Sequence, residues 1–222
     1  MMSRRFDLSV YLVTDTALCG PRGVVETVRA AIEGGATLVQ LRDPDAHGRA
    51  LVEVVRALLA LLRPRGIPLL VNDRVDVALA AGADGVHVGQ SDMAPADVRR
   101  LIGPEPILGL SVGTLTEFAA SDLSGVDYLG VGPVFITGTK IDAGAAIGVD
   151  GVAAIRAHTN LPIVAIGGID ASRAAACIAA GADGAAVVSA ICAAPDPRAA
   201  TAKLAAVIAD ARREVASRRP LA

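Results

Sequence analysis

Two aspartates follow apolar runs that are consecutive along the chain. Asp73 comes directly after Leu-Leu-Val-Asn, and Asp92 comes shortly after Gly-Val-His-Val. A pair of carboxylates at neighbouring strand ends, completed by substrate phosphate oxygens, is a ligand set that Mg²⁺ favours. Aspartate also caps helices well. The spacing alone therefore leaves metal binding and helix capping equally open.

A cluster of cations would favour a site for Mg²⁺ and a phosphorylated substrate. The chain contains only two lysines, Lys140 and Lys203, and Lys140 ends a Thr-Gly-Thr-Lys segment at 137–140. Arg42 follows another apolar run. Arginine can clamp phosphate oxygens with two parallel hydrogen bonds, whereas lysine acts as a point charge. We therefore predict an anionic substrate that is held by Arg42, Lys140 and the hydroxyl groups of the loop.

The elements that must position these residues alternate regularly. Short β-branched and apolar runs predict eight strands, and several are continuously apolar, as in parallel sheets that are covered on both faces. The predicted strands are Leu8–Thr14, Thr37–Leu41, Pro68–Val71, Gly85–Val88, Ile107–Leu110, Tyr128–Val131, Ile163–Ile166 and Ala185–Val188. The predicted helices are Val24–Glu33, Gly48–Leu62, Val75–Ala80, Pro95–Ile102, Thr114–Ala120, Val149–Ala157, Ala171–Ala179 and Pro197–Arg213.

A short repeat supports this register. The segment Ala-Gly-Ala-Asp-Gly-Val at 81–86 returns as Ala-Gly-Ala-Asp-Gly-Ala at 180–185. In each copy, glycine ends a helix, a polar turn follows and a strand begins. Strict alternation with right-handed crossovers indicates an α/β chain that closes into a (β/α)₈ (TIM) barrel. The alternative, an open doubly wound sheet, lacks a GxGxxG segment after its first strand.

We expect one domain over residues 1–222, with the barrel core at about 8–213, because no linker or change of composition divides the chain. The active site of such a barrel lies at the carboxyl ends of its strands. Gln40, Asn72 and Ser111 fall at these positions. Gly167-Gly168 and Ser189 follow the last two strands, where backbone N–H groups often hold a phosphate, although two ordinary tight turns would look the same.

Composition argues against several other classes of protein. Among 222 residues, 21 Lys+Arg and 23 Asp+Glu give a net charge of −2, and aromatic residues make up 2%. Neither the net charge nor the aromatic content favours nucleic-acid binding. The sequence has no run of about 18 apolar residues, so a membrane span is not expected. The three cysteines, Cys19, Cys177 and Cys192, form no CxxC pair. With no secretion-like segment at the start, we expect a cytoplasmic protein.

The ordered set of segments resembles the thiamine phosphate synthase family, whose members join the pyrimidine and thiazole halves of thiamine monophosphate. The resemblance runs from Tyr11 to Ile191. Its most specific parts are Gln-Leu-Arg at 40–42, Val-Asn-Asp at 71–73, Gly-Val-His-Val-Gly-Gln-Ser-Asp at 85–92, Gly-Leu-Ser at 109–111, Gly-Val-Gly-Pro-Val-Phe at 130–135, Thr-Gly-Thr-Lys at 137–140 and Ala-Ile-Gly-Gly-Ile at 165–169.

The resemblance implies a role for each matching residue. The pyrimidine diphosphate would be bound by Gln40, Arg42, Asn72, Ser111 and Lys140, of which Arg42, Ser111 and Lys140 would be catalytic. Asp73 and Asp92 would hold Mg²⁺. The thiazole phosphate would be bound by Thr137, Gly138, Thr139, Gly168, Val188 and Ser189. The family's reaction is thought to start with departure of diphosphate, and the thiazole nitrogen then captures the pyrimidinylmethyl cation.

Two positions depart from the family pattern. Pro44 stands where the family usually has a lysine, which removes a phosphate cation that Arg74 or Arg49 could replace. Ile136 stands where the loop usually has proline.

Two alternatives to the synthase stay open. One is a thiazole tautomerase-like enzyme of the same fold, although Gly113 occupies the place where that branch is expected to carry its histidine. The other is a non-catalytic barrel that binds thiazole phosphate. The sequence also leaves open whether the chain forms a homo-oligomer and whether the thiazole carries an extra carboxylate.

Overall fold

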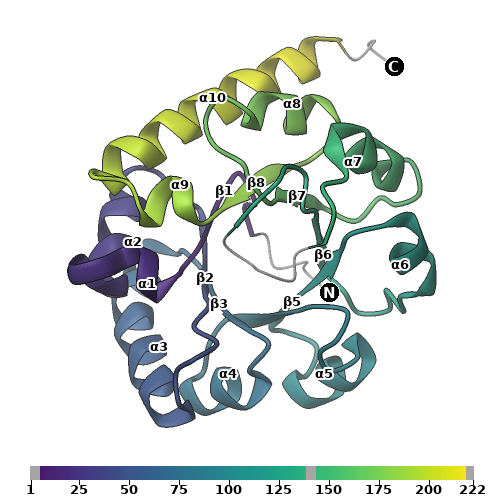
Figure 1. The fold of residues 1–222 in the computed structure, drawn as a ribbon. Helices are drawn as coiled ribbons and strands as arrows, with labels where there is room; N and C mark the ends of the chain where they lie inside the picture. Colours follow the sequence, from purple (N-terminus) through teal and green to yellow (C-terminus); the bar gives the residue numbers. More distant parts are fainter. Residues whose placement is uncertain (1–5, 139–143, 219–222) are drawn as a thin grey trace.

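The computed structural model describes residues 6–138 and 144–218. Eight parallel strands close into a barrel in sequence order, with the last strand pairing with the first (Figure 1). The strands are β1 (Val10–Val13), β2 (Leu38–Leu41), β3 (Leu69–Asn72), β4 (Gly85–Val88), β5 (Ile107–Val112), β6 (Tyr128–Val131), β7 (Ile163–Ile166) and β8 (Gly184–Val187). The predicted (β/α)₈ barrel is confirmed.

Helices surround the barrel on the outside (Figure 1). They are α1 (Thr16–Cys19), α2 (Gly23–Glu33), α3 (Gly48–Leu62), α4 (Val75–Ala81), α5 (Pro95–Ile102), α6 (Leu115–Ala120), α7 (Gly148–Arg156), α8 (Ala174–Ala179), α9 (Ser189–Cys192) and α10 (Pro197–Arg218), with 3₁₀ turns η1 (Gly20–Arg22) and η2 (Arg63–Arg65). The four-residue helices α1 and α9 were not predicted, because one turn carries no helical period. No helix within the described residues is long and apolar enough to cross a membrane.

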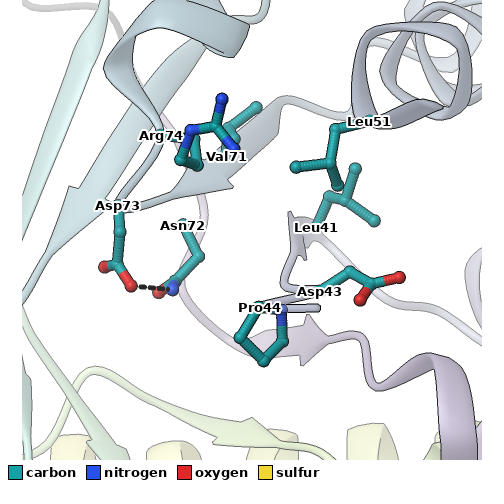
Figure 2. A pocket seen from close by; sticks show the side chains of 8 residues that line it. All are labelled: Leu41, Asp43, Pro44, Leu51, Val71, Asn72, Asp73 and Arg74. Atoms are coloured by element: carbon teal, nitrogen blue, oxygen red, sulfur yellow. Dashed lines mark hydrogen bonds between the residues drawn. The ribbon is translucent and has the colours of Figure 1, made fainter. Parts of the chain in front are cut away.

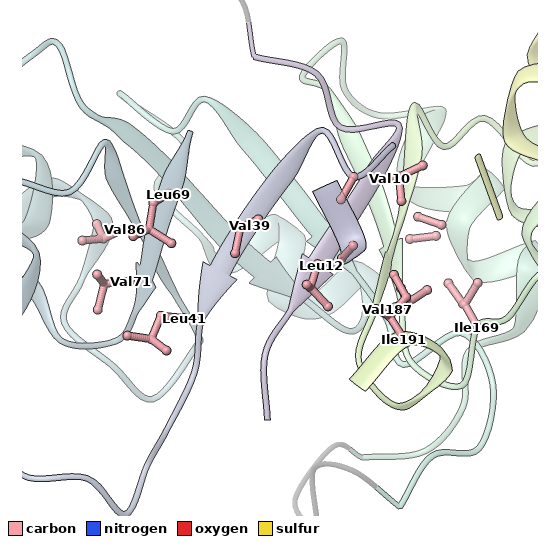
Figure 3. Packing of buried hydrophobic residues seen from close by; sticks show 14 of the residues in the cluster. Val10, Leu12, Val39, Leu41, Leu69, Val71, Val86, Ile169, Val187 and Ile191 are labelled. Atoms are coloured by element: carbon pink, nitrogen blue, oxygen red, sulfur yellow. The ribbon is translucent and has the colours of Figure 1, made fainter. Parts of the chain in front are cut away.

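Alternate residues of each strand serve two different cores. Val10 and Leu12 of β1 belong to the large cluster between strands and helices, which Figure 3 shows from close by. Tyr11 and Val13 point the other way and join the smaller cluster inside the barrel. This follows from the period of two in a strand. Position 87 of β4 is therefore an interior position, which matters for the site.

Pairs of strands are tied together at their amino-terminal ends by one side chain each. The residue directly before each even-numbered strand accepts a hydrogen bond from a backbone N–H near the start of the preceding strand. These bonds are Val10 N to Thr37 Oγ1 (3.0 Å), Leu69 N to Asp84 Oδ2 (2.9 Å), Leu108 N to Asp127 Oδ2 (2.8 Å) and Ile163 N to Asp183 Oδ2 (2.8 Å). Asp84 and Asp183 are the aspartates of the repeated segment, so the repeat marks a recurring strand-start bond.

The helix boundaries follow their local signals. Pro95 is the first residue of α5. The Asp196 carboxylate accepts from the Ala199 backbone N–H at 3.0 Å and so caps α10. Gly82 ends α4 with φ +71°, a left-handed conformation that glycine adopts without steric cost.

Candidate active site

A cavity of about 340 Å³ lies at the carboxyl ends of the barrel strands. Its wall is built from the ends of all eight strands and from the loops that follow them. The lining residues are Tyr11, Val13, Gln40, Arg42, Asn72, Asp73, His87, Gly89, Gln90, Ser91, Ser111, Gly113, Glu117, Gly130, Gly132, Pro133, Thr137, Val164, Ile166, Gly167, Gly168, Ile169, Ala186, Val187, Val188 and Ser189. Parallel strands that close into a barrel bring residues from the whole length of the chain to one rim.

Most of the predicted site residues line this one cavity. They are Gln40, Arg42, Asn72, Asp73, Ser111, Thr137, Gly168, Val188 and Ser189. Asp92 and Gly138 are not among the lining residues. Thr139 and Lys140 lie outside the described residues.

Arg42 is the cation of the described cavity wall. Its backbone N–H donates to Thr14 Oγ1 at 3.1 Å, and this bond fixes the chain just beyond β2. Within residues 6–138 and 144–218, its guanidinium makes no ion pair. Asp73 and Glu117 are the carboxylates of the same wall. One arginine against two carboxylates leaves a highly charged phosphate ligand in need of further cations.

Asp73 stands in an unusual backbone conformation. Its φ is +60°, and no other non-glycine residue of the described chain has a positive φ. Its backbone N–H donates to the His87 carbonyl oxygen at 2.8 Å, and its Oδ2 accepts from Asn72 Nδ2 at 2.5 Å. A non-glycine residue held in this region is a mark of functional sites.

Asp92 is held differently. Its Oδ2 accepts from the Gly89 backbone N–H at 2.7 Å, which braces the turn after β4. Helix α4 starts after Arg74 and α5 after Ala94, in both cases without a side-chain cap. The helix-capping interpretation of Asp73 and Asp92 is therefore wrong.

The carboxylates at the site suit a Mg²⁺ ion that takes most of its oxygen ligands from water and substrate. Among the described residues, no three His, Cys, Asp or Glu side chains come together as a metal cage. Mg²⁺, however, commonly uses one or two carboxylates and takes its other oxygens from water and substrate phosphates. Asp73, with Asp92 at the next strand end, fits an ion that arrives with a diphosphate.

The loop after β7 needs its two glycines. Gly167 and Gly168 have φ values of +98° and +63°. The Phe135 N–H donates to the Gly167 carbonyl oxygen at 3.0 Å, and a Cβ on Gly168 would lie 2.6 Å from the Ile136 carbonyl oxygen. The absence of side chains thus lets the loop after β6 pack directly on the loop after β7.

The end of β8 completes this side of the cavity. Val188 has a non-helical backbone with φ −113° and ψ −82°, and Ser189 begins the short helix α9. The first N–H groups of a helix have no acceptor within the helix. Gly168, Val188 and Ser189 line the cavity together, and an anion cradle at these residues stays a prediction.

Pro44 lines a smaller pocket of about 180 Å³ beside the cavity, across from Asn72 and Asp73 (Figure 2). Arg74 lines the same pocket, but its Nε and Nη2 donate to the Asp76 carboxylate, at 2.9 and 2.7 Å. These hydrogen bonds hold the pKa of Asp76 below its usual value. Arg49 lines neither the pocket nor the larger cavity. Replacement of the family lysine by Arg74 or Arg49 stays a prediction.

Sequence reasoning did not assign Tyr11, His87 or Glu117 to the site. The two ring nitrogens of His87 contact Tyr128 Oη and Ser111 Oγ, so His87 is a hydrogen-bonded residue of the barrel interior. The inward register of β1 and β4 was a signal that could have placed Tyr11 and His87 in the cavity. Glu117 carried no such signal, because a glutamate on a surface helix is ordinary.

Two cysteines that are far apart in sequence meet behind the rim. Cys19 of α1 and Cys192 of α9 are both buried, and the Cys192 thiol donates to the Val13 carbonyl oxygen at 3.7 Å. The neighbouring Cys192 thiol lowers the pKa of Cys19, and the neighbouring Cys19 together with burial raises the pKa of Cys192. Cys177 is also buried, and burial raises its pKa to about 11.

Fold and cavity together define a protein of the (β/α)₈-barrel class, with its candidate site at the carboxyl ends of the strands. A family model described as thiamine monophosphate synthase matches residues 10–191. The chain belongs to this family, whose members are transferases.

Named relatives extend the similarity over nearly the whole chain. A thiamine-phosphate synthase of Xanthobacter autotrophicus is 65% identical over 95% of this chain and 100% of its own. That of Azorhizobium caulinodans is 58% identical over 96% and 100%. The solved thiamine phosphate pyrophosphorylase from Pyrococcus furiosus superimposes with a TM-score of 0.84 at 41% identity, covering 92% of this chain and 96% of that one.

Proposed function

We propose that this chain condenses hydroxymethylpyrimidine diphosphate with thiazole phosphate, or its carboxylate, to give thiamine monophosphate and pyrophosphate. The observation that carries the proposal is the convergence of Gln40, Arg42, Asn72, Asp73 and Ser111 on one cavity. Five positions in or directly after three strands, β2, β3 and β5, come together, and each carries the residue type that the family resemblance implies.

The proposed reaction requires that the site stabilise the departing diphosphate anion. The bond between the methylene carbon and the diphosphate oxygen breaks, and its electron pair leaves with the diphosphate. The thiazole nitrogen then donates its lone pair to the methylene carbon and forms the new C–N bond. No described cysteine or lysine lines the cavity, which suits a reaction without an enzyme nucleophile.

Arg42 is the residue best placed to stabilise the departing diphosphate. Its guanidinium is free of ion pairs within the described residues and can offer two parallel donors to phosphate oxygens. Charge on the diphosphate grows as the bond breaks, so this contact strengthens in the transition state. Lys140 and the hydroxyl of Ser111 would act on the same group.

Asp73 and Asp92 would hold Mg²⁺ against the diphosphate, and the bound ion would neutralise charge on the leaving group. Asp92 would use the carboxylate oxygen that is not bonded to Gly89. On the opposite side, the loops after β6, β7 and β8 would hold the thiazole phosphate through Thr137, Gly138, Thr139, Gly168, Val188 and Ser189. Two anchored rings meet in a fixed orientation, which lowers the entropy cost of the reaction.

The direct test mixes purified protein with both phosphorylated halves and Mg²⁺, and follows thiamine monophosphate and pyrophosphate by chromatography. We expect equal amounts of both products, formed only when both halves are present. Binding of thiazole phosphate without Mg²⁺-dependent binding of the pyrimidine diphosphate would instead support a non-catalytic binder. Isomerisation of the thiazole alone would support a tautomerase-like enzyme.

The Pro44 position gives a second test of the diphosphate site. Pro44→Lys places a cation across from Asn72 and Asp73. We expect the KM for the pyrimidine diphosphate to fall about two- to fivefold, on the scale of one solvent-exposed charge contact. Pro44→Ala is the matched control, because it removes the ring without adding charge. A rise in KM in the lysine variant alone would show that the loop has adapted to proline.

A further inference from the structure

A chain of hydrogen bonds crosses the barrel interior between two predicted substrate ligands. Gln40 Nε2 donates to Tyr11 Oη at 2.6 Å, and Tyr11 Oη lies 2.8 Å from Tyr128 Oη. Tyr128 Oη lies 2.8 Å from His87 Nδ1, and His87 Nε2 lies 2.8 Å from Ser111 Oγ. The chain therefore links β2, β1, β6, β4 and β5, and both of its ends line the cavity.

The barrel makes room for this chain. A Cβ on Gly109 would lie 2.3 Å from Tyr128 Oη and 2.4 Å from His87 Nδ1, and a Cβ on Gly130 would lie 3.0 Å from His87 Cε1. Gln40 is 3% exposed, His87 7% and Tyr128 0%. Burial raises the pKa values of Tyr11 and Tyr128 well above the ordinary value of 10, so both hydroxyls keep their protons.

Counting protons gives the chain one direction. Tyr11 Oη accepts from the Gln40 amide N–H, so Tyr128 Oη is the acceptor that its own hydroxyl hydrogen needs when every buried polar group of the chain is paired. The Tyr128 hydrogen then goes to His87 Nδ1, which must be the unprotonated ring nitrogen. His87 Nε2 therefore carries the ring proton and donates it to Ser111 Oγ. The hydroxyl hydrogen of Ser111 is left outside the chain, on the cavity side.

We propose that Tyr11, Tyr128 and His87 are positioning residues that fix the hydrogen-bonding polarity of the cavity. Through them, Gln40 turns its carbonyl oxygen to the substrate as an acceptor, and Ser111 offers its hydroxyl as a donor. This inference rests on the proposed function. Gln40 and Ser111 would contact a polar substrate ring that has one hydrogen-bond donor and one acceptor. Tyr11, Tyr128 and His87 lie behind these two residues and would set which of them donates and which accepts.

The direction of the chain can be tested without any substrate. The protein has three histidines, His47, His87 and His158, so long-range ¹H–¹⁵N spectra of the imidazoles are simple to assign with single His→Gln variants. We expect His87 to be the Nε2–H tautomer at neutral pH. The Nδ1–H tautomer, or a mixture of the two, would overturn the proposal.

The two tyrosines provide a matched pair of variants. Tyr128→Phe removes the donor to His87 Nδ1, so we expect the single tautomer to be lost. Tyr11→Phe removes the hydroxyl that donates to Tyr128 one step earlier in the chain, so the Tyr128 hydrogen is no longer directed to His87 and we expect the preference for the Nε2–H tautomer to weaken there as well. An unchanged tautomer in Tyr128→Phe would overturn the proposal.

Kinetics separate positioning from stability. In Tyr128→Phe we expect kcat/KM for the pyrimidine diphosphate to fall at least about tenfold, on the scale of one weakened transition-state contact. The KM for thiazole phosphate should stay within about twofold, because its predicted ligands lie on other loops. An equal loss for both substrates would mean a general structural defect and would contradict the proposal.

Rescue at His87 completes the test. His87→Gln keeps an N–H donor for Ser111, whereas His87→Leu has a similar size and no donor. We expect the glutamine variant to recover at least about tenfold of the kcat/KM that the leucine variant loses. Equal losses in both variants would overturn the relay. If the wild-type protein formed no product at all, the proposed function would fail, while the tautomer experiment would still decide the relay.

Discussion

The arginines near the cavity differ in whether a carboxylate already binds them. Arg42 lines the cavity without an ion pair in the described chain, whereas Arg74 beside Pro44 is bound by Asp76, and Arg49 lines neither pocket. Arg42 should therefore have a larger effect on diphosphate binding than any other described arginine. The planar guanidinium, and not only its charge, should matter.

This leads to a prediction for a pair of substitutions. Arg42→Lys keeps the charge and loses the two parallel donors, and we expect kcat/KM for the pyrimidine diphosphate to fall about tenfold. Arg42→Gln should lower it about a hundredfold, since both the charge and its geometry are lost. The measurement is steady-state kinetics with the diphosphate varied. Arg29→Gln, on the outer face of α2 beside Glu26, is the control and should behave like the wild type. Wild-type kinetics in Arg42→Gln would remove Arg42 from the mechanism.

The buried tyrosine pair makes a separate prediction about pH. The chain has two tyrosines and no tryptophan, so absorbance near 295 nm reports on Tyr11 and Tyr128 alone. Their folded-state pKa values are raised above 10 by burial, whereas the unfolded chain ionises near 10. Stability is therefore unaffected by these groups below pH 10 and decreases above it, where the unfolded state loses its phenolic protons first.

We expect tyrosinate to appear only together with alkaline unfolding. The check is a parallel titration by absorbance and by far-ultraviolet circular dichroism. Tyrosinate that forms near pH 10 while the fold is intact would contradict the burial of the pair.

At the scale of elements, the side chain before each even-numbered strand joins two neighbouring strands. Asp183 accepts from the Ile163 N–H at 2.8 Å and lies 3.4 Å from an Arg156 nitrogen. Asp127 accepts from the Leu108 N–H and pairs with Arg99 at 2.8 Å. These contacts lie at the end of the barrel opposite the cavity, where residues contribute to stability and not to catalysis.

Removing one of these bonds should therefore change stability alone. Asp183→Ala leaves the Ile163 N–H without its acceptor, and we expect the free energy of unfolding to fall by about 1–3 kcal/mol. Asp97→Ala removes an aspartate from an exposed pair with Arg100, and should cost at most about 0.5 kcal/mol. Urea unfolding measures both, and kcat should stay within about twofold of wild type. A loss of turnover in Asp183→Ala with unchanged stability would contradict this assignment.

At the scale of the whole molecule, β1 pairs with β8, and α10 packs on α2, α8 and α9 while also contacting β1. The first strand and the last helix of the described chain thereby pack on the same side of the barrel. No strand of the closed barrel has a free edge, so partial unfolding would expose unpaired backbone groups. A single domain over residues 1–222 remains our prediction, together with a cytoplasmic setting, small-molecule substrates and no nucleic-acid partner.

One cooperative transition should follow from a single domain. We expect thermal unfolding curves by near- and far-ultraviolet circular dichroism to coincide. Saturating pyrimidine diphosphate with Mg²⁺ should raise the midpoint, because it binds only the folded barrel. Two separate transitions would divide the chain and contradict the prediction.

The sequence by itself determined the alternation of strands and helices, the closed barrel and the strand ends at which Gln40, Arg42, Asn72 and Ser111 lie. These features depend on local patterns, namely apolar runs, glycine stops and the polar residue that follows each strand.

Only the tertiary structure decided which of these residues share a hydrogen bond or a cavity wall. It showed that Asp92 braces a turn while Asp73 faces the cavity, that Arg74 is bound by Asp76, and that Cys19 meets Cys192. The physical reason is the same in each case. A hydrogen bond depends on a few tenths of an ångström and on direction, which closure of the barrel sets and which spacing along the chain does not encode.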